Sequence, residues 1–513
     1  MNTNQDRALS GTVTRRQLIF GAGGGLAALA LAGLAGYEWP RKSAVRAASL
    51  PIRTSVPGEA QFQSFVSRPD LRPPRVGITS LSSDPGRPGY IFLAPRTYVT
   101  GGGGQQGLMI IDRQGRLVWW RPATSQPFDL LAQAYQAKPV LTWWQGKVVY
   151  TYGEGIGEMA GSDYTGLQQI RAGDGLQADL HELQLTSSGT ALLTAYQVVT
   201  EDLSKLGGAK KGQVVTGHIQ EVDLASGKVL WDWDSLDHVG LAESYAALAA
   251  DEAYDYFHVN SIAEMPDGQL LVSARNTWAL YKIDRASGKI VSRLGGKRSD
   301  FTFGAGARFY WQHDARPHGA SAISVFDDGS SPAEERQSRG LLLDVSSTRK
   351  HVSLRQAYQH PAAFLAANQG NVQVLADGRV FVGWGNQPYF SEFAPGGELL
   401  LQGELPFGYH SYRALTYDWE ATPAEAPAAA ALANPAGGTE VFASWNGSTA
   451  VERWVVLAGK ERSSLGEVGS QDWTGFETAV VVNSSGPWFS VVATGRGGSV
   501  LARSEPVKVG QAQ

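Results

Sequence analysis

Short apolar runs, each introduced by a polar turn that contains glycine, recur along most of the chain. Such turns are expected at residues 145–146, 188–189, 267–268 and 377–378. Leucine, valine and aromatic residues follow each of them, as is typical of a buried strand after a tight turn. The pattern therefore predicts an all-β protein.

A second pattern places an apolar run on each side of a polar turn, at residues 111–119, 222–231, 283–291 and 393–399. Each of these segments predicts a β-hairpin. Repeated four-stranded units that close into a ring form a β-propeller. We therefore expect a six-bladed propeller, with five blades as the alternative count. A stacked solenoid is the alternative, but its repeats are usually shorter and more regular.

The segments outside this repeat region suggest a division into domains. We expect the propeller over residues 90–421, preceded at 48–89 by an extension that wraps the body. Residues 422–438 are rich in Pro, Ala and Gly, which indicates a linker. Residues 439–513 alternate short strands with turns and contain four tryptophans. This pattern predicts a C-terminal β-sandwich of the fibronectin or immunoglobulin type.

Residues 1–47 have the features of an export signal. Arg15 and Arg16 stand directly before a Gly- and Ala-rich apolar stretch that runs to Gly36. Paired arginines in this position are typical of a twin-arginine signal peptide, with cleavage expected after Ala47. The alternative is an uncleaved membrane tether, since about 20 apolar residues suffice to span a bilayer. In either case we expect a secreted, periplasmic or surface-attached protein.

Composition excludes several function classes. The chain contains no cysteine, which rules out a thiol nucleophile, a thiolate metal site and disulfide bonds. Its 44 basic and 48 acidic residues give a net charge of −4, with no basic stripe. Nucleic-acid binding therefore has no electrostatic support. The sequence leaves open whether the chain forms a homodimer.

Three of the nine histidines share a context. His181, His258 and His313 each precede a predicted strand and have an aspartate within three residues. Taken singly, a histidine beside a turn is more often a structural hydrogen-bonding residue. The repetition of such a histidine in successive blades favours a functional role, because the inner strands of a propeller begin at one mouth of the central channel. We therefore expect the three imidazoles, which can act as nucleophile, acid or base, to converge there.

Arg275 ends the strand that His258 introduces. A cation at the channel mouth needs an anion, and a planar guanidinium suits the oxygens of sulfate or phosphate. The alternative is an ion pair with a blade carboxylate. Asn260 and Asn276 are candidate hydrogen-bond donors to a substrate, and Tyr256 is a candidate contact for an aromatic ring.

Several motifs occur in a specific order, although each alone is weak: Asp179–Glu182, Phe257–Ser261, Ser273–Arg275, Leu294–Gly296 with Ser299–Phe301, Gln312–Ala315, Ile323–Gly329, Ser338–Gly340 and Ser411–Arg413. As an ordered set they resemble the arylsulfotransferases, in particular the branch found in actinobacteria and fungi. The resemblance covers roughly residues 90–423.

This resemblance implies a PAPS-independent enzyme that moves a sulfuryl group from an aryl sulfate to a phenol through a sulfohistidine. His313 matches the nucleophile, His258 and Arg275 would hold the sulfate oxygens, and His181 would complete the site. No metal and no nucleotide cofactor is implied. Asp314 departs from the expected pattern, because a carboxylate there could orient the imidazole or repel an anionic donor.

Two other functions remain open at this point. A non-catalytic exported propeller could bind glycans or cell-wall polymer, with the C-terminal sandwich as a second contact. A quinone-dependent dehydrogenase would need a set of calcium ligands and stacking tryptophans, and the sequence contains no recognisable set of this kind.

Overall fold

The computed structural model describes residues 61–81, 89–97, 104–249 and 251–512. The twin-arginine motif and the rest of segment 1–47 lie outside these residues. The described part is all-β, with four short 3₁₀ helices and no α-helix. Within it, no helix is both long and apolar enough to cross a membrane.

Five sheets form a propeller-like body. The first half of the body contains the strands β1 (Gly77–Ser80), β2 (Tyr90–Leu93), β4 (Gly107–Ile111), β5 (Leu117–Pro122), β6 (Gln126–Tyr135), β7 (Lys138–Val149), β8 (Tyr152–Gly161), β9 (Gln168–Ile170), β10 (Ala178–Leu185), β11 (Thr190–Glu201), β12 (Gly212–Asp223), β13 (Val229–Asp234) and β14 (Tyr254–Asp255). The second half contains β15 (Val259–Glu264), β16 (Leu270–Ala274), β17 (Ala279–Ile283), β18 (Ile290–Gly295), β19 (Thr302–Phe303), β20 (His313–His318), β21 (Ala322–Asp327), β22 (Arg339–Ser346), β23 (His351–Gln359), β24 (Asn371–Val374), β25 (Val380–Gly383), β26 (Tyr389–Phe393), β27 (Leu399–Glu404) and β29 (Ala414–Tyr417). A separate two-stranded pair joins β3 (Arg96–Thr97) to β28 (Tyr409–His410).

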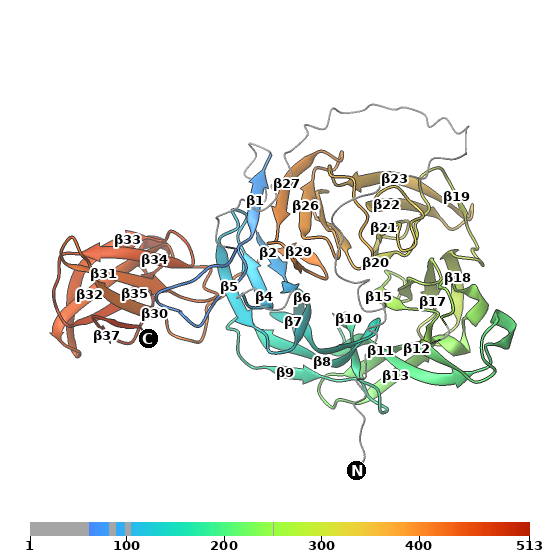
Figure 1. Ribbon diagram of the computed structural model, residues 1–513, viewed down its shortest axis with the longest axis horizontal. Helices are drawn as coiled ribbons and strands as arrows, with labels where there is room; N and C mark the ends of the chain where they lie inside the picture. Colours follow the sequence, from blue (N-terminus) through green and yellow to red (C-terminus); the bar gives the residue numbers. More distant parts are fainter. Residues whose placement is uncertain (1–60, 82–88, 98–103, 250, 513) are drawn as a thin grey trace, which may run out of the picture. The chain divides into compact units, whose positions relative to one another are not determined.

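These sheets follow one another around a central axis (Figure 1). The contacts between their inner strands run from β6 to β10, β15, β20 and β24, and return through β25, β29 and β2 to β6. The ring is closed by backbone pairing, because β29 joins the sheet of β2, β4 and β5. The extension adds β1 to the outer edge of the sheet that ends in β27. The predicted propeller class is confirmed.

The blade number stays a prediction. The strands β6–β9 and β10–β13 are joined into one nine-stranded sheet through a single residue pair, Ala178 and Gly155. Hydrogen bonding therefore does not separate these two units, although each has its own hairpins.

Three of the four predicted glycine turns are confirmed. Gly189, Gly268 and Gly378 adopt φ values of +81°, +78° and +84°, which glycine reaches without a steric penalty. The turn expected at Gln145-Gly146 is wrong, because both residues lie inside β7. A Cβ atom on Gly146 would stand 2.6 Å from the ring of Trp144, so close packing and not a turn explains this glycine.

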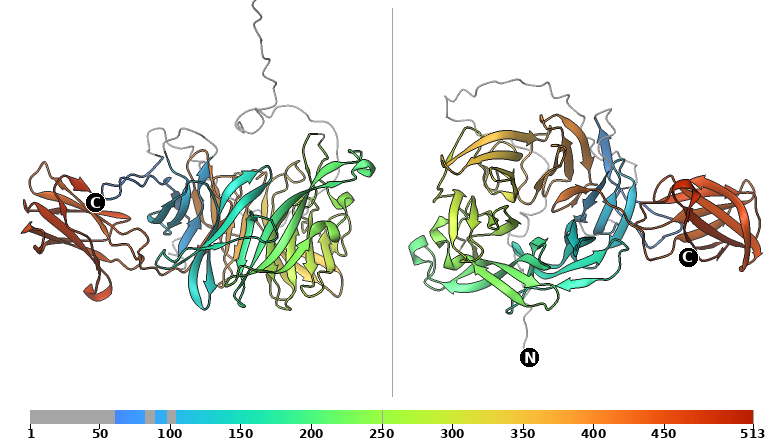
Figure 2. Two further views of the ribbon diagram at one scale, coloured as in Figure 1. Left: turned by 90° about the horizontal axis from the view of Figure 1, so that it is seen from below. Right: turned by 180° about the vertical axis from the view of Figure 1, so that it is seen from behind.

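The C-terminal residues form a two-sheet β-sandwich, seen in red in Figure 2. One sheet contains β30 (Ala428–Ala433), β31 (Thr439–Ser444), β34 (Glu477–Val482) and β38 (Gln511–Ala512), and the other contains β32 (Arg453–Glu461), β33 (Ser464–Asp472), β35 (Trp488–Thr494), β36 (Val500–Arg503) and β37 (Val507–Lys508). Their shared core includes Trp445, Trp454 and Phe489. Its assignment to the fibronectin or immunoglobulin type stays a prediction.

The linker predicted at 422–438 needs a correction. Residues 428–433 form β30, and Ala429, Ala430 and Ala431 are fully buried. The alanine run resembles low-complexity sequence, but its small side chains let the two sheets pack closely. Residues 428–433 of the predicted linker are therefore part of the sandwich.

Two amides join the last propeller strand to its neighbouring sheet. Asn371 Nδ2 donates to the Ala414 carbonyl at 2.9 Å, and the Ala414 N–H donates back to Oδ1 at 2.9 Å. Gln373 and Thr416 repeat this exchange at 2.9 and 2.8 Å. These side chains take the place of a missing backbone ladder between β24 and β29.

Asn371→Ala should lower the free energy of unfolding by about 2 to 5 kcal/mol, because it leaves a buried N–H and a buried C=O without partners. Gln373→Ala should cost less, since Gln373 lines a cavity where water can replace the lost bonds. Urea unfolding of both variants checks this. An equal loss in the two variants would contradict the role assigned to the buried amide.

Candidate functional site

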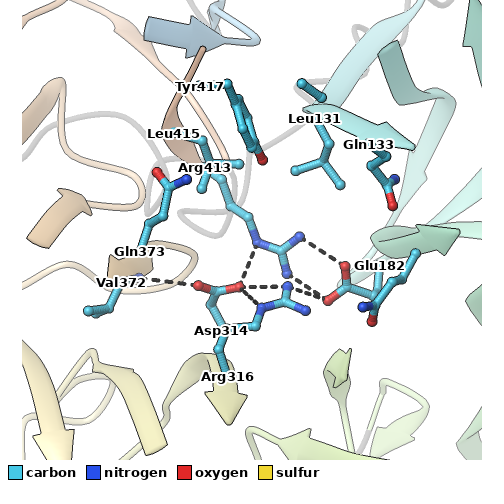
Figure 3. Close-up of a pocket in the computed structure, with 12 residues that line it drawn as sticks. Leu131, Gln133, Glu182, Asp314, Arg316, Val372, Gln373, Arg413, Leu415 and Tyr417 are labelled. Atoms are coloured by element: carbon cyan, nitrogen blue, oxygen red, sulfur yellow. Dashed lines mark hydrogen bonds and ion pairs between the residues drawn. The ribbon is translucent and has the colours of Figure 1, made fainter. Parts of the chain in front are cut away.

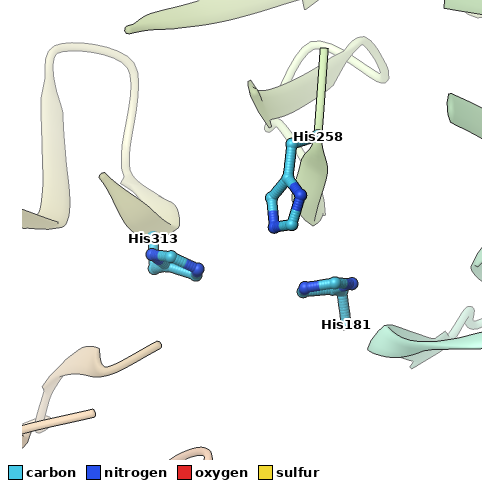
Figure 4. A group of neighbouring side chains, drawn as sticks. All are labelled: His181, His258 and His313. Carbon is cyan, nitrogen blue, oxygen red and sulfur yellow. The ribbon is translucent and has the colours of Figure 1, made fainter. Parts of the chain in front are cut away.

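The structure brings the three predicted histidines together. One ring nitrogen from each of His181, His258 and His313 lies within 4.8 Å of the other two, and all three side chains are buried (Figure 4). His181 lies on β10, His258 directly precedes β15, and His313 begins β20. The predicted convergence is confirmed; the catalytic roles stay predictions.

An aspartate holds the Nδ1 atom of each ring. The Nδ1–Oδ2 distances are 2.6 Å for His181 and Asp179, 2.6 Å for His258 and Asp255, and 2.8 Å for His313 and Asp328. The Nε2 atoms are therefore the ones left to face the shared space. A carboxylate on one ring nitrogen fixes the orientation of the ring and the site of its proton.

Further hydrogen bonds hold two of these carboxylates. Asp179 accepts from the Gly153 N–H at 2.6 Å and the Thr194 hydroxyl at 2.9 Å, and Asp255 accepts from the Thr151 hydroxyl at 2.7 Å. Burial would raise the pKa of both carboxyls, but their histidines and these donors outweigh it and the pKa of each is lowered. Both are therefore carboxylates that accept from Nδ1–H.

One contact identifies the proton-bearing nitrogen of His313. The backbone N–H of Gln369 points at Nε2 across 3.3 Å. A nitrogen that accepts carries a lone pair, so the proton of the ring is on Nδ1, next to Asp328. His313 therefore carries its electron pair on Nε2, where the pair accepts a long hydrogen bond from the Gln369 N–H.

Burial has the largest influence on the acidity of this cluster. It lowers the pKa of His258 from the ordinary 6.5, although the Asp255 charge opposes it. It lowers the pKa of His313 well below that value, and the Arg275 charge adds to the effect. Burial raises the pKa of Asp328 well above its ordinary value, although the Arg275 charge opposes this. His258 and His313 are neutral near pH 7.

Local backbone geometry turns these side chains toward the axis. His258 and Asp314 have φ values of +57° and +53°, a conformation that costs residues other than glycine of order 1 kcal/mol. The pairing register shifts at the start of β15 and of β20. Such bulges re-aim side chains beside active sites, and here they direct residues near the strand ends inward.

Arg275 lies beside this cluster. Its N–H donates to the His258 carbonyl at 2.9 Å, and its guanidinium contacts Asn276 Oδ1, the Ala367 carbonyl and the face of Trp311. Within the part of the chain that the structure describes, it makes no ion pair, and its buried Nε has no partner. The side chain is half-buried. The alternative interpretation as an ion pair is therefore not supported.

The three predicted substrate-binding residues have internal roles instead. Asn260 Nδ2 donates to the Gln312 carbonyl at 2.7 Å and so links β15 to β20. Asn276 Nδ2 donates to the Asp255 carbonyl at 2.6 Å. Tyr256 is 0% exposed within the blade core, so its predicted contact with a substrate ring is wrong. Aromatic residues of this kind pack blades more often than they bind ligands.

Asp314 does not orient the nucleophile, contrary to one expectation. It forms ion pairs with Arg316 at 2.7 Å and with Arg413 at 3.2 Å, and accepts from the Val372 N–H. Glu182 also bonds to both arginines, at 2.6 and 3.1 Å. Because Glu182 and Asp314 directly follow His181 and His313, this charged layer anchors the strands that carry two of the site histidines.

A cavity of about 260 Å³ adjoins the charged layer (Figure 3). Leu131, Gln133, Leu415 and Tyr417 line its less charged side. The layer also includes Asp129, which pairs with Arg413 at 2.6 Å. Burial raises the pKa of Asp129 to about 7, although the Arg413 charge opposes this. The cavity is therefore polar where Glu182, Asp314 and Arg413 line it.

The aspartate at His313 could not be assigned from the sequence. Asp328 lies 15 residues beyond His313 and directly follows β21, whose last residue is Asp327. By contrast, Asp179 and Asp255 lie two and three residues before their histidines. The paired aspartates were a visible signal, but only the hairpin β20–β21 shows which of them reaches the ring.

Comparisons with known proteins agree with the ordered motifs. The family model described as arylsulfotransferase (ASST) matches residues 132–405, more than half of the chain. No curated protein matches the chain significantly.

Similar solved structures include a protein of unknown function from Bacteroides caccae. It has 14% identity and a TM-score of 0.39, and the match covers 64% of this chain and 99% of that one. Saccharomyces cerevisiae Sqt1 has 10% identity and a TM-score of 0.32, and the match covers 66% and 76% of the two chains. These scores are low and carry no argument about function. On the family match, the chain belongs to the arylsulfotransferase family.

Proposed function

We propose that the protein transfers a sulfuryl group from an aryl sulfate to a phenol, without a nucleotide donor, through a sulfohistidine at His313. The observation that carries this proposal is the Nε2 electron pair of a buried, neutral imidazole whose Nδ1–H is held by Asp328. The family match supports small aryl molecules as the substrate class.

In the first step, Nε2 of His313 attacks sulfur while the bond from sulfur to the aryl oxygen breaks. The phenolate leaves with the electron pair of that bond, and the ring gains a positive charge. Asp328 offsets this charge at Nδ1, as a carboxylate does for a catalytic imidazolium. In the second step, an acceptor phenol loses its proton and takes the sulfuryl group, which restores the neutral ring.

Arg275 is suited to hold the sulfate oxygens, because its Nε has no hydrogen-bond partner among the described residues, although the charges of Asp328 and Asp255 act on it from a distance. Such donors stabilise charge that develops in the transition state. His258 can assist only when Nε2 carries a proton, since Asp255 occupies its Nδ1. A bound anion raises the pKa of a neighbouring imidazole and supplies that condition. His181 is left as the acid or base partner for the phenol.

We also propose that the chain is exported by the twin-arginine route. The paired arginines before the Gly- and Ala-rich stretch support this. Replacing both Arg15 and Arg16 by lysine should retain the protein in the cytoplasm of a host with that pathway. Immunoblots of cell fractions measure the outcome, and unchanged export of the doubly substituted chain would refute the proposal.

His313→Ala should reduce the acceptor-dependent release of nitrophenol from p-nitrophenyl sulfate by at least roughly 10³-fold, because the covalent step is lost. His351→Ala is the matched control, since His351 lies on β23 outside the cluster. Intact-mass analysis of the wild-type protein without acceptor should detect one added sulfuryl group. Full activity of His313→Ala, or release that does not depend on an acceptor, would exclude the proposal.

Binding of inorganic sulfate should be accompanied by proton uptake. The pKa of His258 lies below 6.5 in the free protein and rises when an anion binds. Between the pKa of the free protein and that of the complex, each fall of one pH unit should therefore raise the affinity for sulfate by up to about tenfold. Calorimetric titrations in two buffers of different ionisation enthalpy measure the uptake. His258→Gln should remove it, and sulfate affinity that does not vary with pH would contradict this assignment.

A further inference from the structure

The arrangement of the three imidazoles has a second chemical consequence. A carboxylate at Nδ1 leaves Nε2 as the ring nitrogen that can bind a ligand, and three rings held in this way have one nitrogen each within 4.8 Å of the others. Lone pairs that converge attract an electron-pair acceptor. An aryl sulfate needs only one of them, at sulfur, whereas a metal ion can use all three.

The surroundings match those of histidine metal sites. Metal-ligating histidines almost always donate their other ring N–H to a carboxylate, which orients the ring and raises its basicity. All three rings meet this condition, with buried aspartates at 2.6 to 2.8 Å. Two of these aspartates, Asp255 and Asp328, have a second buried oxygen without a partner. Carboxyl oxygens that no hydrogen bond occupies therefore lie behind the ligand set.

We propose that His181, His258 and His313 form a binding site for one divalent transition-metal ion, such as Zn²⁺, and that an ion bound there blocks sulfuryl transfer. Binding does not depend on the proposed function; the block rests on it, because a metal would occupy the electron pair of His313. Three imidazoles plus one open position is a coordination set that zinc accepts, and imidazole also suits copper and nickel.

The required movement is small. Nitrogen ligands of a tetrahedral zinc ion lie roughly 3.3 Å apart, given Zn–N distances of about 2.0 Å. The ring nitrogens lie at separations up to 4.8 Å, so the rings must close inward by about 1 Å. The nearby Arg275 charge opposes a cation and favours an anion. Arg275 therefore affects the binding of metal ions and of anions in opposite directions.

The test uses the full-length protein, stripped of metal and titrated with Zn²⁺ by calorimetry. Wild type should bind one ion per chain, and X-ray absorption at the zinc edge should show about three imidazole nitrogens near 2.0 Å. His258→Ala should lose binding, and His351→Ala should retain it. Asp255→Asn keeps all three ligands and should weaken affinity by roughly 10- to 100-fold through loss of ring orientation.

Arg275→Met should change the affinities for zinc and for sulfate in opposite directions. Removing this cation should tighten Zn²⁺ binding and weaken binding of inorganic sulfate. The proposal is overturned if wild type binds no ion, if the bound zinc has fewer than two imidazole ligands, or if folded His258→Ala binds as tightly as wild type. The wild-type spectrum decides the matter even if that variant does not fold.

Activity measurements separate this inference from the proposed function. Equimolar Zn²⁺ should abolish nitrophenol release, and a chelator should restore it. Zinc binding without any sulfuryl transfer in the metal-free protein would refute the proposed function and leave the metal site standing. Sulfuryl transfer that continues with zinc bound would refute the block.

Discussion

The hydrogen bond from each Nδ1 to a buried carboxylate decides what this site can do. It fixes the tautomer, and therefore determines whether the ring presents a lone pair or a proton to the channel. Without Asp179, Asp255 and Asp328, the three rings could rotate or exchange tautomers, and their convergence would carry little chemical meaning. With them, three oriented imidazoles lie beside an arginine whose Nε has no hydrogen-bond partner among the described residues.

The propeller supports this arrangement through its inner strands. The strands β10 and β20 each present a histidine and, one residue later, a carboxylate that joins the layer around Arg413. Buried ion pairs of this kind are weak evidence for stability, because desolvation offsets much of the attraction. Their consequence here is positional: the strands that carry His181 and His313 are held at a common charged layer.

Sequence patterns predicted the fold class and the three histidines because both depend on repetition. Glycine turns before apolar runs repeat along the chain, and His181, His258 and His313 occupy matching places in three repeats. The patterns failed where contacts come from distant residues. Gly146 leaves room for the ring of Trp144, and the alanines of β30 pack at an interface between two sheets. Asp328 contacts His313 across a hairpin. The predicted substrate contact of Tyr256 and the orienting role considered for Asp314 were wrong because local sequence does not show which way a side chain faces.

The most direct test of this account is the protonation of the ring nitrogens. Nitrogen-15 NMR of the protein labelled only at histidine should place the proton of the neutral His313 ring on Nδ1 at pH 7, assigned by comparison with His313→Ala. The same tautomer is expected for His258. A proton on Nε2 of His313 would contradict the account, because that nitrogen could then neither attack sulfur nor bind a metal ion.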